Sequence, residues 1–295
     1  MSIIGHQKIV NFLDKSLEKN QLAQAYLFVG PEHLGKFSLA LEFARKINGE
    51  SNQKNISSDI SVLSPEIEEK DGKIKKKDIK IEKIRELEHD LSLSTSAGKY
   101  KIAIIDEAEK LNKASQNALL KTLEEPPQKT IIILITSDIN KIIPTIKSRC
   151  VIKKFNLVGE GEMKGILKSE DVDLKFWSLK RPGLAINLQE NKEELERRKK
   201  AQQDLEKMLQ ANLSERFSFC ETLSKNVPEM TEELNFWLAI LRENILGNDT
   251  FFRLNPQKAL KIILGIERSL KIIRETNSNP RLIMENLMLE FHPME

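Results

Sequence analysis

Carboxylate and hydroxyl side chains end two apolar segments near the middle of this 295-residue chain. The segments and the side chains that end them are Ile102–Ile105 with Asp106 and Glu107, and Ile131–Ile135 with Thr136 and Ser137. Short segments that are apolar at every position are typical of strands buried on both faces of a parallel sheet. Ligands of such sheets bind beyond the carboxyl ends of the strands. We therefore expect these four polar side chains to converge on a ligand site.

The carboxylate pair has a specific use in nucleotide hydrolysis. An aspartate at this place holds Mg²⁺ through its water shell, and the adjacent glutamate polarises the attacking water. Thr136 and Ser137 are placed to hydrogen-bond a γ-phosphate or that water. Two plainer interpretations remain open, because Asp106 is also placed to cap the next helix and hydroxyls commonly end strands. A phosphate-binding loop elsewhere in the chain favours the hydrolytic interpretation.

Such a loop is indicated near the N-terminus. The apolar run Ala25–Val29 predicts a strand, which leads through the segment 30–35 into Lys36 and a helical pattern. Glycines let backbone amides curl around phosphates, a helix N-terminus favours negative charge, and the lysine adds a positive charge. Gly30, Gly35 and Lys36 match the pattern G-x-x-x-x-G-K-[ST]. The plainer interpretation is a tight turn between strand and helix with a surface lysine.

The loop departs from this pattern at its last position. Phe37 stands where a serine or threonine hydroxyl would ligand Mg²⁺. Ser38, one residue further, points about 100° away around a helix and does not simply substitute for it. We therefore expect a working or relic phosphate loop with at most weak binding of ATP and Mg²⁺, and without efficient hydrolysis.

A serine-arginine-cysteine triplet follows the second central segment. Arg149 lies between Ser148 and Cys150, beyond a short helix that contains Pro144. An arginine just past the sheet need not face its own nucleotide, and it is placed to reach a neighbouring subunit's site as an arginine finger. The plainer interpretation is a surface arginine in a salt bridge.

The remaining elements predict an α/β domain followed by an all-α part. Residues 1–156 alternate strand and helix patterns, as in a parallel-sheet domain. Residues 157–192 carry the patterns of about three short helices, and residues 193–295 are helical throughout. Asn255 and Asn279 are each followed by proline, which fits an N-cap and the first helical position. The last hundred residues or so carry no catalytic constellation, and this indicates assembly or docking.

A charged segment precedes the central strands. After a predicted strand at Ile60–Leu63, residues 66–77 favour an exposed hairpin around the turn Asp71-Gly72. The lysines of this segment are Lys73, Lys75, Lys76 and Lys77. Such a cluster is usually solvated surface, and contact with nucleic acid is the alternative.

Composition narrows the class of protein. Hydrophobic residues make up 40% and charged residues 31% of the chain, and the formal net charge of +3 argues against a dedicated polyanion-coating surface. Cys150 and Cys220 are far apart and form no metal-binding pattern, which favours a reducing compartment. The first residues do not show the charged and apolar regions of a signal peptide. No apolar run approaches the roughly 20 residues that a helix needs to span a bilayer. We expect a cytoplasmic protein without a membrane partner.

Five segments, in this order and spacing, resemble clamp-loader subunits of the AAA+ superfamily: GPEHLGK, IAIIDEAEKL, NALLKTLEEPP, ILITSD and TIKSRC. The likeness is strongest to the delta-prime type of subunit of bacterial DNA polymerase III, and it extends from IIGHQ to NPRLIMENLML. It implies a P-loop AAA+ domain, a small helical lid and a helical collar that holds a hetero-oligomeric ring. Such a ring opens a sliding clamp and places it on primed DNA during DNA replication.

The resemblance also implies roles for particular residues. A delta-prime subunit usually does not hydrolyse ATP itself and acts as a component of the DNA polymerase III holoenzyme. Arg149 would complete the ATP site of an adjacent gamma/tau motor subunit, and Ser148 and Cys150 would position it. The delta subunit and the sliding clamp would be further partners, with DNA contacted through the assembled complex.

Departures from the family pattern favour a subunit that is silent toward nucleotides. Besides Phe37, His33 stands where functional loops of the family usually have a second glycine. Gly183 stands where the family's sensor-2 arginine is aligned, although a shift of two residues would place Arg181 there instead. Many relatives carry a four-cysteine zinc module after the loop helix. Residues 49–78 contain no cysteine, so we expect no zinc and no other metal site.

Two alternatives stay open. A motor subunit of the gamma/tau type, or of the small-subunit type of replication factor C, would hydrolyse ATP with Lys36, Asp106 and Glu107. Phe37 and the missing sensor-2 arginine disfavour it. A general AAA+ adaptor outside replication is disfavoured by the Ser-Arg-Cys triplet together with the collar-like segments.

Overall fold

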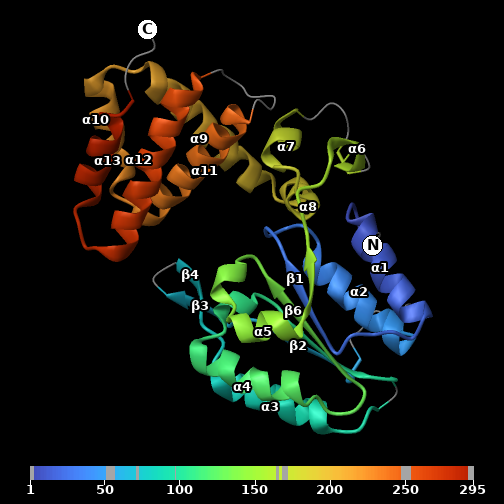
Figure 1. Ribbon diagram of the computed structural model, residues 1–295. Coiled ribbons are helices and arrows are strands. Elements are labelled where there is room, and N and C mark those ends of the chain that lie inside the picture. Colours follow the sequence, from blue (N-terminus) through green and yellow to red (C-terminus); the bar gives the residue numbers. More distant parts are fainter. Residues whose placement is uncertain are drawn as a thin grey trace. The chain divides into compact units, whose positions relative to one another are not determined.

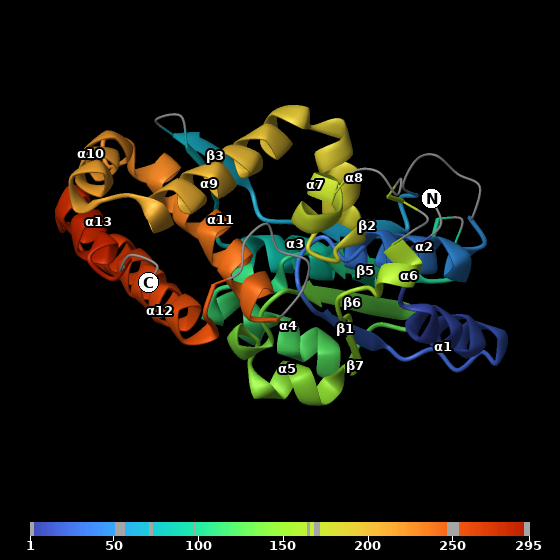
Figure 2. The same ribbon diagram turned by 90° about the horizontal axis from the view of Figure 1, so that it is seen from above.

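The chain forms two compact units in this computed structural model (Figures 1 and 2). The first unit comprises residues 1–169 and 178–186, and the second comprises residues 170–177 and 187–295. The structure describes residues 3–50, 57–70, 73–96, 98–163, 166–167, 172–246 and 254–291. The division into three domains expected from the sequence stays a prediction.

A five-stranded parallel sheet is the centre of the first unit. Its order is β2 (Ile60–Leu63), β5 (Lys101–Ile105), β6 (Thr130–Thr136), β1 (Ala25–Val29) and β7 (Val151–Lys154). All seven residues of the central strand β6 are buried, because helices cover both faces of the sheet. The parallel α/β sheet predicted from the two central apolar segments is therefore confirmed.

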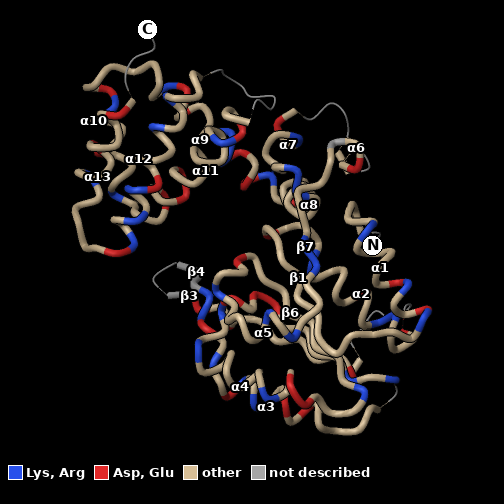
Figure 3. The backbone as a smooth tube through the Cα atoms, in the orientation of Figure 1, with Lys and Arg blue, Asp and Glu red and all other residues tan. Residues whose placement is uncertain are grey.

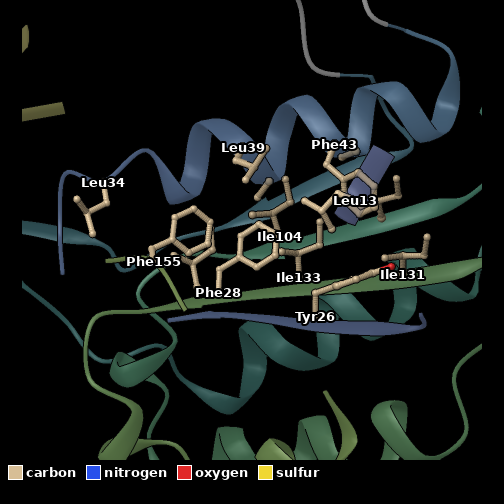
Figure 4. Packing of buried hydrophobic residues seen from close by; sticks show 14 of the residues in the cluster. Leu13, Tyr26, Phe28, Leu34, Leu39, Phe43, Ile104, Ile131, Ile133 and Phe155 are labelled. Carbon is tan, nitrogen blue, oxygen red and sulfur yellow. The ribbon is translucent and has the colours of Figure 1, made fainter. Parts of the chain in front are cut away.

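Helices on the two faces bury alternate side chains of the same strands (Figure 1). The helices are α1 (Gln7–Glu18) and α2 (Lys36–Asn48) on one face, and α3 (Ile81–Ser92), α4 (Lys113–Glu124) and α5 (Pro144–Arg149) on the other. In β5, Ile102 and Ile104 point into the cluster under α2, whereas Ala103 and Ile105 point into the cluster under α3 and α4. This follows from the two-residue period of a strand. Figure 4 shows Leu39 and other side chains of the first cluster packed over the sheet.

Short elements complete the first unit. They are the antiparallel hairpin β3 (Ile67–Lys70) and β4 (Lys73–Lys76), the 3-10 turns Ala108–Lys110 and Ile139–Lys141, and α6 (Glu160–Met163). The hairpin confirms the prediction for residues 66–77. Its expected turn, Asp71-Gly72, and the side chains of Lys73 and Lys75 lie outside the described part of the chain.

The second unit is helical. Its helices are α7 (Val172–Trp177), α9 (Lys192–Gln210), α10 (Leu213–Leu223), α11 (Val227–Ile245), α12 (Pro256–Glu275) and α13 (Pro280–Met288), and α8 (Pro182–Glu190) begins in the first unit and ends in the second. The side chains of Asn255 and Asn279 accept hydrogen bonds from the N–H groups of Gln257 and Arg281, so both predicted N-caps are confirmed. Within the described ranges, no helix has the length and apolar character needed to cross a membrane.

A partly buried carboxyl, that of Glu233, lies beside the aromatic side chain of Trp237 in the second unit. The indole Nε1 of Trp237 donates to the Ala201 carbonyl and to Oε1 of Glu233, both at 2.9 Å. Burial, with the charge of Asp204 adding to it, raises the pKa of Glu233 to about 7, and the hydrogen bond from Trp237 only partly opposes this. The folded protein therefore holds this carboxyl protonated at pH values where the unfolded chain releases the proton.

We expect this carboxyl to make stability fall as pH rises. The loss begins near the ordinary pKa of 4.5 and is complete above about 7. A shift of this size corresponds to on the order of 1–3 kcal/mol of unfolding free energy. Urea unfolding at pH 5 and at pH 8 measures the effect, and Glu233→Gln should be the more stable protein at the higher pH. An equal change with pH in both proteins would contradict the assignment.

Candidate functional site

Side chains from three strand ends and the loop before α2 line one pocket of about 320 Å³. Its lining includes the predicted residues Gly35, Lys36, Phe37, Asp106, Glu107, Thr136 and Ser137, together with Lys76, Glu109 and Gly183. Gly30 lies at the end of β1, where the loop begins. The sequence therefore identified most of the residues that meet here, but it did not identify Lys76 or Glu109.

The loop between β1 and α2 has the tight backbone of a phosphate loop. A Cβ atom at Gly30, where φ is +154°, would lie 2.3 Å from the carbonyl oxygen of Phe155, so only glycine fits. Gly35 and His33 both have left-handed backbone, with φ of 79° and 63°. The conformation at residue 33 is one that glycine adopts at lower cost, which gives a physical reason for a glycine at this position in related loops.

The lysine of this loop is bonded to the loop itself. Nζ of Lys36 donates to the carbonyl oxygens of Gly30 at 2.6 Å and Pro31 at 2.5 Å. The side chain is buried, and burial lowers its pKa while the charge of Asp106 opposes the shift. In this arrangement the ammonium group satisfies backbone carbonyls of the loop and does not point a free charge at a phosphate.

The carboxylates at the end of β5 also have partners within the chain. Asp106 accepts a hydrogen bond from the N–H of Glu107 at 3.0 Å, and burial raises its pKa. Glu107 has left-handed backbone, with φ of 50°, and its Oε1 lies 2.5 Å from Nζ of Lys76 on the hairpin. The hairpin therefore brings a lysine to the carboxylate that would polarise water in a hydrolase.

The two hydroxyls at the end of β6 are engaged locally. Oγ1 of Thr136 donates to the Asp138 carbonyl and accepts from the Asp138 N–H, both at 3.1 Å. The hydroxyl of Ser137 donates to Glu109, which also accepts the Ser137 N–H at 3.1 Å. Burial alone would raise the pKa of Glu109. The hydrogen bonds that its carboxylate accepts together outweigh burial, so the pKa is lowered. Glu109 lies two residues after Glu107, and this proximity is the only feature of the sequence that could have indicated its place in the site.

The first turn of α8 closes on the loop. The N–H of Gly183 donates to the His33 carbonyl at 2.8 Å, and a Cβ atom at Gly183 would lie 2.8 Å from that same oxygen. A side chain at this position would therefore displace the loop. Arg181 is near enough for its charge to contribute, as a smaller cause than burial, to the lowered pKa of Lys36. Both candidates for the sensor-2 position thus lie at this site.

The Ser-Arg-Cys triplet lies at the end of α5 and does not line the pocket. Nη2 of Arg149 is 2.5 Å from Oε1 of Glu124 at the end of α4, and Nη1 donates to the Thr145 carbonyl at 3.0 Å. Ser148 is a weak partner, since its Oγ is 3.5 Å from Nη1 of the arginine. Cys150 packs against the apolar cluster under α4, and burial raises its pKa to about 12, so the thiol is neutral.

Residues 5–158 match the model of the family described as DNA polymerase III, delta subunit. This match covers more than half of the chain and includes every element that forms the pocket except α8. The chain belongs to this family. It is a member of the DNA polymerase III clamp-loader families with an AAA+ fold.

Relatives of this chain include gamma and tau subunits. The DNA polymerase III subunit gamma of Buchnera aphidicola subsp. Acyrthosiphon pisum is 34% identical over 61% of this chain and 52% of the relative. The subunit tau of Bacillus subtilis is 33% identical over 60% of this chain and 33% of the relative. The chain thus spans about half of the first relative and a third of the second.

A solved structure confirms the fold. The DNA polymerase III gamma subunit-related protein of Thermotoga maritima superposes with a TM-score of 0.55 at 21% identity, covering 95% of this chain and 98% of that one. At this level of identity the likeness extends to the fold alone.

The residues of the pocket do not fit Mg-ATP as they are arranged. Phe37 packs its ring partly against the core beside α2 and offers no ligand to a metal ion. The two lysines of the pocket are bonded to loop carbonyls and to Glu107, and its four carboxylates, Glu32, Asp106, Glu107 and Glu109, outnumber them. A triphosphate would meet net negative charge here.

Proposed function

We propose that this chain is a delta-prime-type subunit of a DNA polymerase III clamp loader that is silent toward ATP at its own site. Membership of the family supports the clamp-loader part of the proposal. The main observation in favour of a site that does not use ATP is that Lys36 donates hydrogen bonds to the carbonyls of its own loop. The pairing of Glu107 with Lys76 and the phenylalanine at position 37 point the same way.

Arg149 is then the group that acts on ATP, in the site of a neighbouring motor subunit. Its guanidinium is partly exposed at the end of α5, outside the pocket of its own chain, which suits action on another subunit. The partners are the gamma/tau motor and delta subunits and the sliding clamp, with primed DNA reached through the assembled complex. In this proposal residues 193–295 form the collar and the protein works in the cytoplasm, where it helps to load the sliding clamp during DNA replication.

A motor subunit that hydrolyses ATP is the alternative. The retained pair Asp106 and Glu107 favours it, as do relatives that are gamma and tau subunits. Titrating the isolated chain with a fluorescent ATP analogue and Mg²⁺ separates the two functions. The proposal expects no saturable binding and negligible hydrolysis. Tight binding together with hydrolysis, both abolished by Lys36→Ala, would favour the motor subunit instead.

Restoring the missing hydroxyl alone should not restore ATP binding. Phe37→Thr completes the pattern G-x-x-x-x-G-K-[ST], but it leaves Lys36 on the loop carbonyls and Glu107 on Lys76. We therefore expect the variant to show the same background signal as the parent in the Mg-ATP titration. A Phe37→Leu variant controls for the loss of ring packing. Saturable binding by Phe37→Thr but not by Phe37→Leu would show that the missing hydroxyl alone had silenced the site.

A further inference from the structure

The strand β2 leaves one edge of the parallel sheet without a partner among the described residues. The carbonyl oxygens of Asp59 and Leu63 accept hydrogen bonds from the N–H groups of Ile102, within β5, and of Asp106, just after β5. The backbone N–H and C=O groups of successive residues in a strand point alternately to its two sides. Those of Val62 therefore point away from β5, toward the open edge of the sheet. The side chain of Val62 is also exposed. An edge of this kind is a template for a further strand.

A groove runs beside this edge. It has a volume of about 570 Å³, larger than the pocket around Lys36, and residues of β2, of the connection 77–80 and of α3 line it. Its floor is apolar, because the buried side chains of Ile79 and Leu87 form it. Val62 of β2, whose side chain is exposed, also lines the groove. A groove between an open strand and a helix is the geometry in which proteins bind peptides by strand addition.

The helix side of the groove carries a row of acidic side chains. Glu82, Glu86 and Asp90 line it at intervals of four residues and all are exposed. Glu86 is paired with Lys83 at 2.9 Å, but Glu82 and Asp90 form no ion pair with any residue that the structure describes. Counting the whole lining, five carboxylates face three lysines, so the groove is acidic in a chain whose net charge is +3. Figure 3 shows the acidic positions along α3.

The spacing of this row matches an extended peptide. Four residues of helix rise about 6 Å, and two residues of strand rise about 6.6 Å. Alternate side chains of a strand placed on β2 therefore fall opposite successive acids of α3. A peptide with lysine or arginine at every second position would meet all three carboxylates while its backbone pairs with Val62.

We infer that the groove between β2 and α3 binds an extended basic segment of a partner protein, added as a sixth strand to the sheet. Backbone hydrogen bonds to Val62 set the register, and the acids of α3 select alternate positive side chains, while the residues between them point to the opposite face of the sheet. The inference does not depend on nucleotide binding or on Arg149, so it stands or falls separately from the proposed function.

A fluorescent peptide with the repeat Lys-x-Lys-x-Lys, titrated into the full chain and followed by anisotropy, tests the site. We expect saturable binding, weaker by about 10-fold or more for an isomer with its lysines contiguous. Glu82→Lys with Asp90→Lys should weaken binding by a similar factor. Glu18→Lys with Glu125→Lys makes the same change in net charge outside the groove and should leave the affinity nearly unchanged.

A second pair of variants tests strand addition itself. Val62→Pro removes the outward N–H without touching the bonds to β5, and proline is tolerated on edge strands. It should weaken peptide binding about 10-fold, whereas Val62→Thr should not. Hydrogen exchange gives an independent readout, because the Val62 amide should become protected when the peptide binds. The inference would be overturned if the peptide does not bind. It would also be overturned if neither the charge reversal nor Val62→Pro changes the affinity for the peptide. A concentration-dependent dimer lost in Val62→Pro would assign the edge to a second copy of this chain and overturn it as well.

Discussion

Replacing Arg149 by alanine should lower the DNA-stimulated ATP turnover of the assembled clamp loader by at least about tenfold. An arginine finger stabilises the charge that develops on the transferred phosphoryl group, and losing one commonly costs three or more orders of magnitude at the affected site. The expected fall in the complex is smaller because other sites contribute to the turnover that is measured. The isolated chain, silent in the proposal, should show no change.

The structure indicates that this substitution leaves the fold intact. The guanidinium is about a third exposed, and its ion pair with Glu124 lies at the surface. Exposed pairs of this kind contribute about 0–1 kcal/mol to stability. Loss of turnover would therefore report on catalysis, provided that gel filtration shows the variant still in the complex.

Three further variants sharpen this experiment. Arg85→Ala removes an exposed arginine from α3 and should leave turnover unchanged. Arg149→Lys keeps the positive charge but loses the paired donors, so it should remain well below the parent protein. Glu124→Gln releases Arg149 from its ion pair and should preserve turnover, because the finger itself is intact. Unchanged turnover in Arg149→Ala would exclude the finger and leave the residue as a surface salt bridge.

The sheet and its flanking helices were predictable because their signals are local. Segments that are apolar at every position became β5 and β6, and the helical pattern that begins at Lys36 became α2. The order of the strands was not predictable in this way. β1 pairs with β6 and with β7, more than a hundred residues later in the chain, and no local pattern encodes that choice. β7 itself alternates partly buried with exposed residues and ends in two lysines, Lys153 and Lys154, as suits an edge strand.

The residue types of the candidate site were predictable, but their partners were not. Spacing placed Lys36, Asp106 and Glu107 at strand ends that converge. The contacts that silence the site in our proposal depend on residues distant in sequence, such as Lys76, 31 positions before Glu107. The ion pair of Arg149 with Glu124 likewise spans 25 positions. Such pairings follow from tertiary packing, and one sequence without its structure contains no periodic signal for them.

Arg216 is a buried arginine on which two helix ends of the second unit depend. Its side chain is almost inaccessible, with 4% of the residue exposed. Nε donates to the Met208 carbonyl at 2.9 Å and Nη2 to the Leu209 carbonyl at 3.4 Å, both in the last turn of α9. Nη1 donates to the carbonyl of Phe291, just after α13. The last carbonyls of a helix have no partner within it and carry partial negative charge, so a guanidinium is well suited to satisfy them.

Arg216→Leu should therefore destabilise the second unit by roughly 3 kcal/mol or more, because it leaves several buried carbonyls without donors. Urea unfolding followed by tryptophan fluorescence measures this, since Trp177 and Trp237 both belong to the second unit. Arg281→Leu is the matched control. That arginine is about half exposed and pairs with Glu221 and Glu285 at the surface, so its loss should cost no more than about 1 kcal/mol. Arg216→Lys keeps the charge with fewer donors and should fall between the two. Equal stability of the two leucine variants would show that water or a shift of α13 satisfies the carbonyls, and that the buried guanidinium is not what holds these helix ends together.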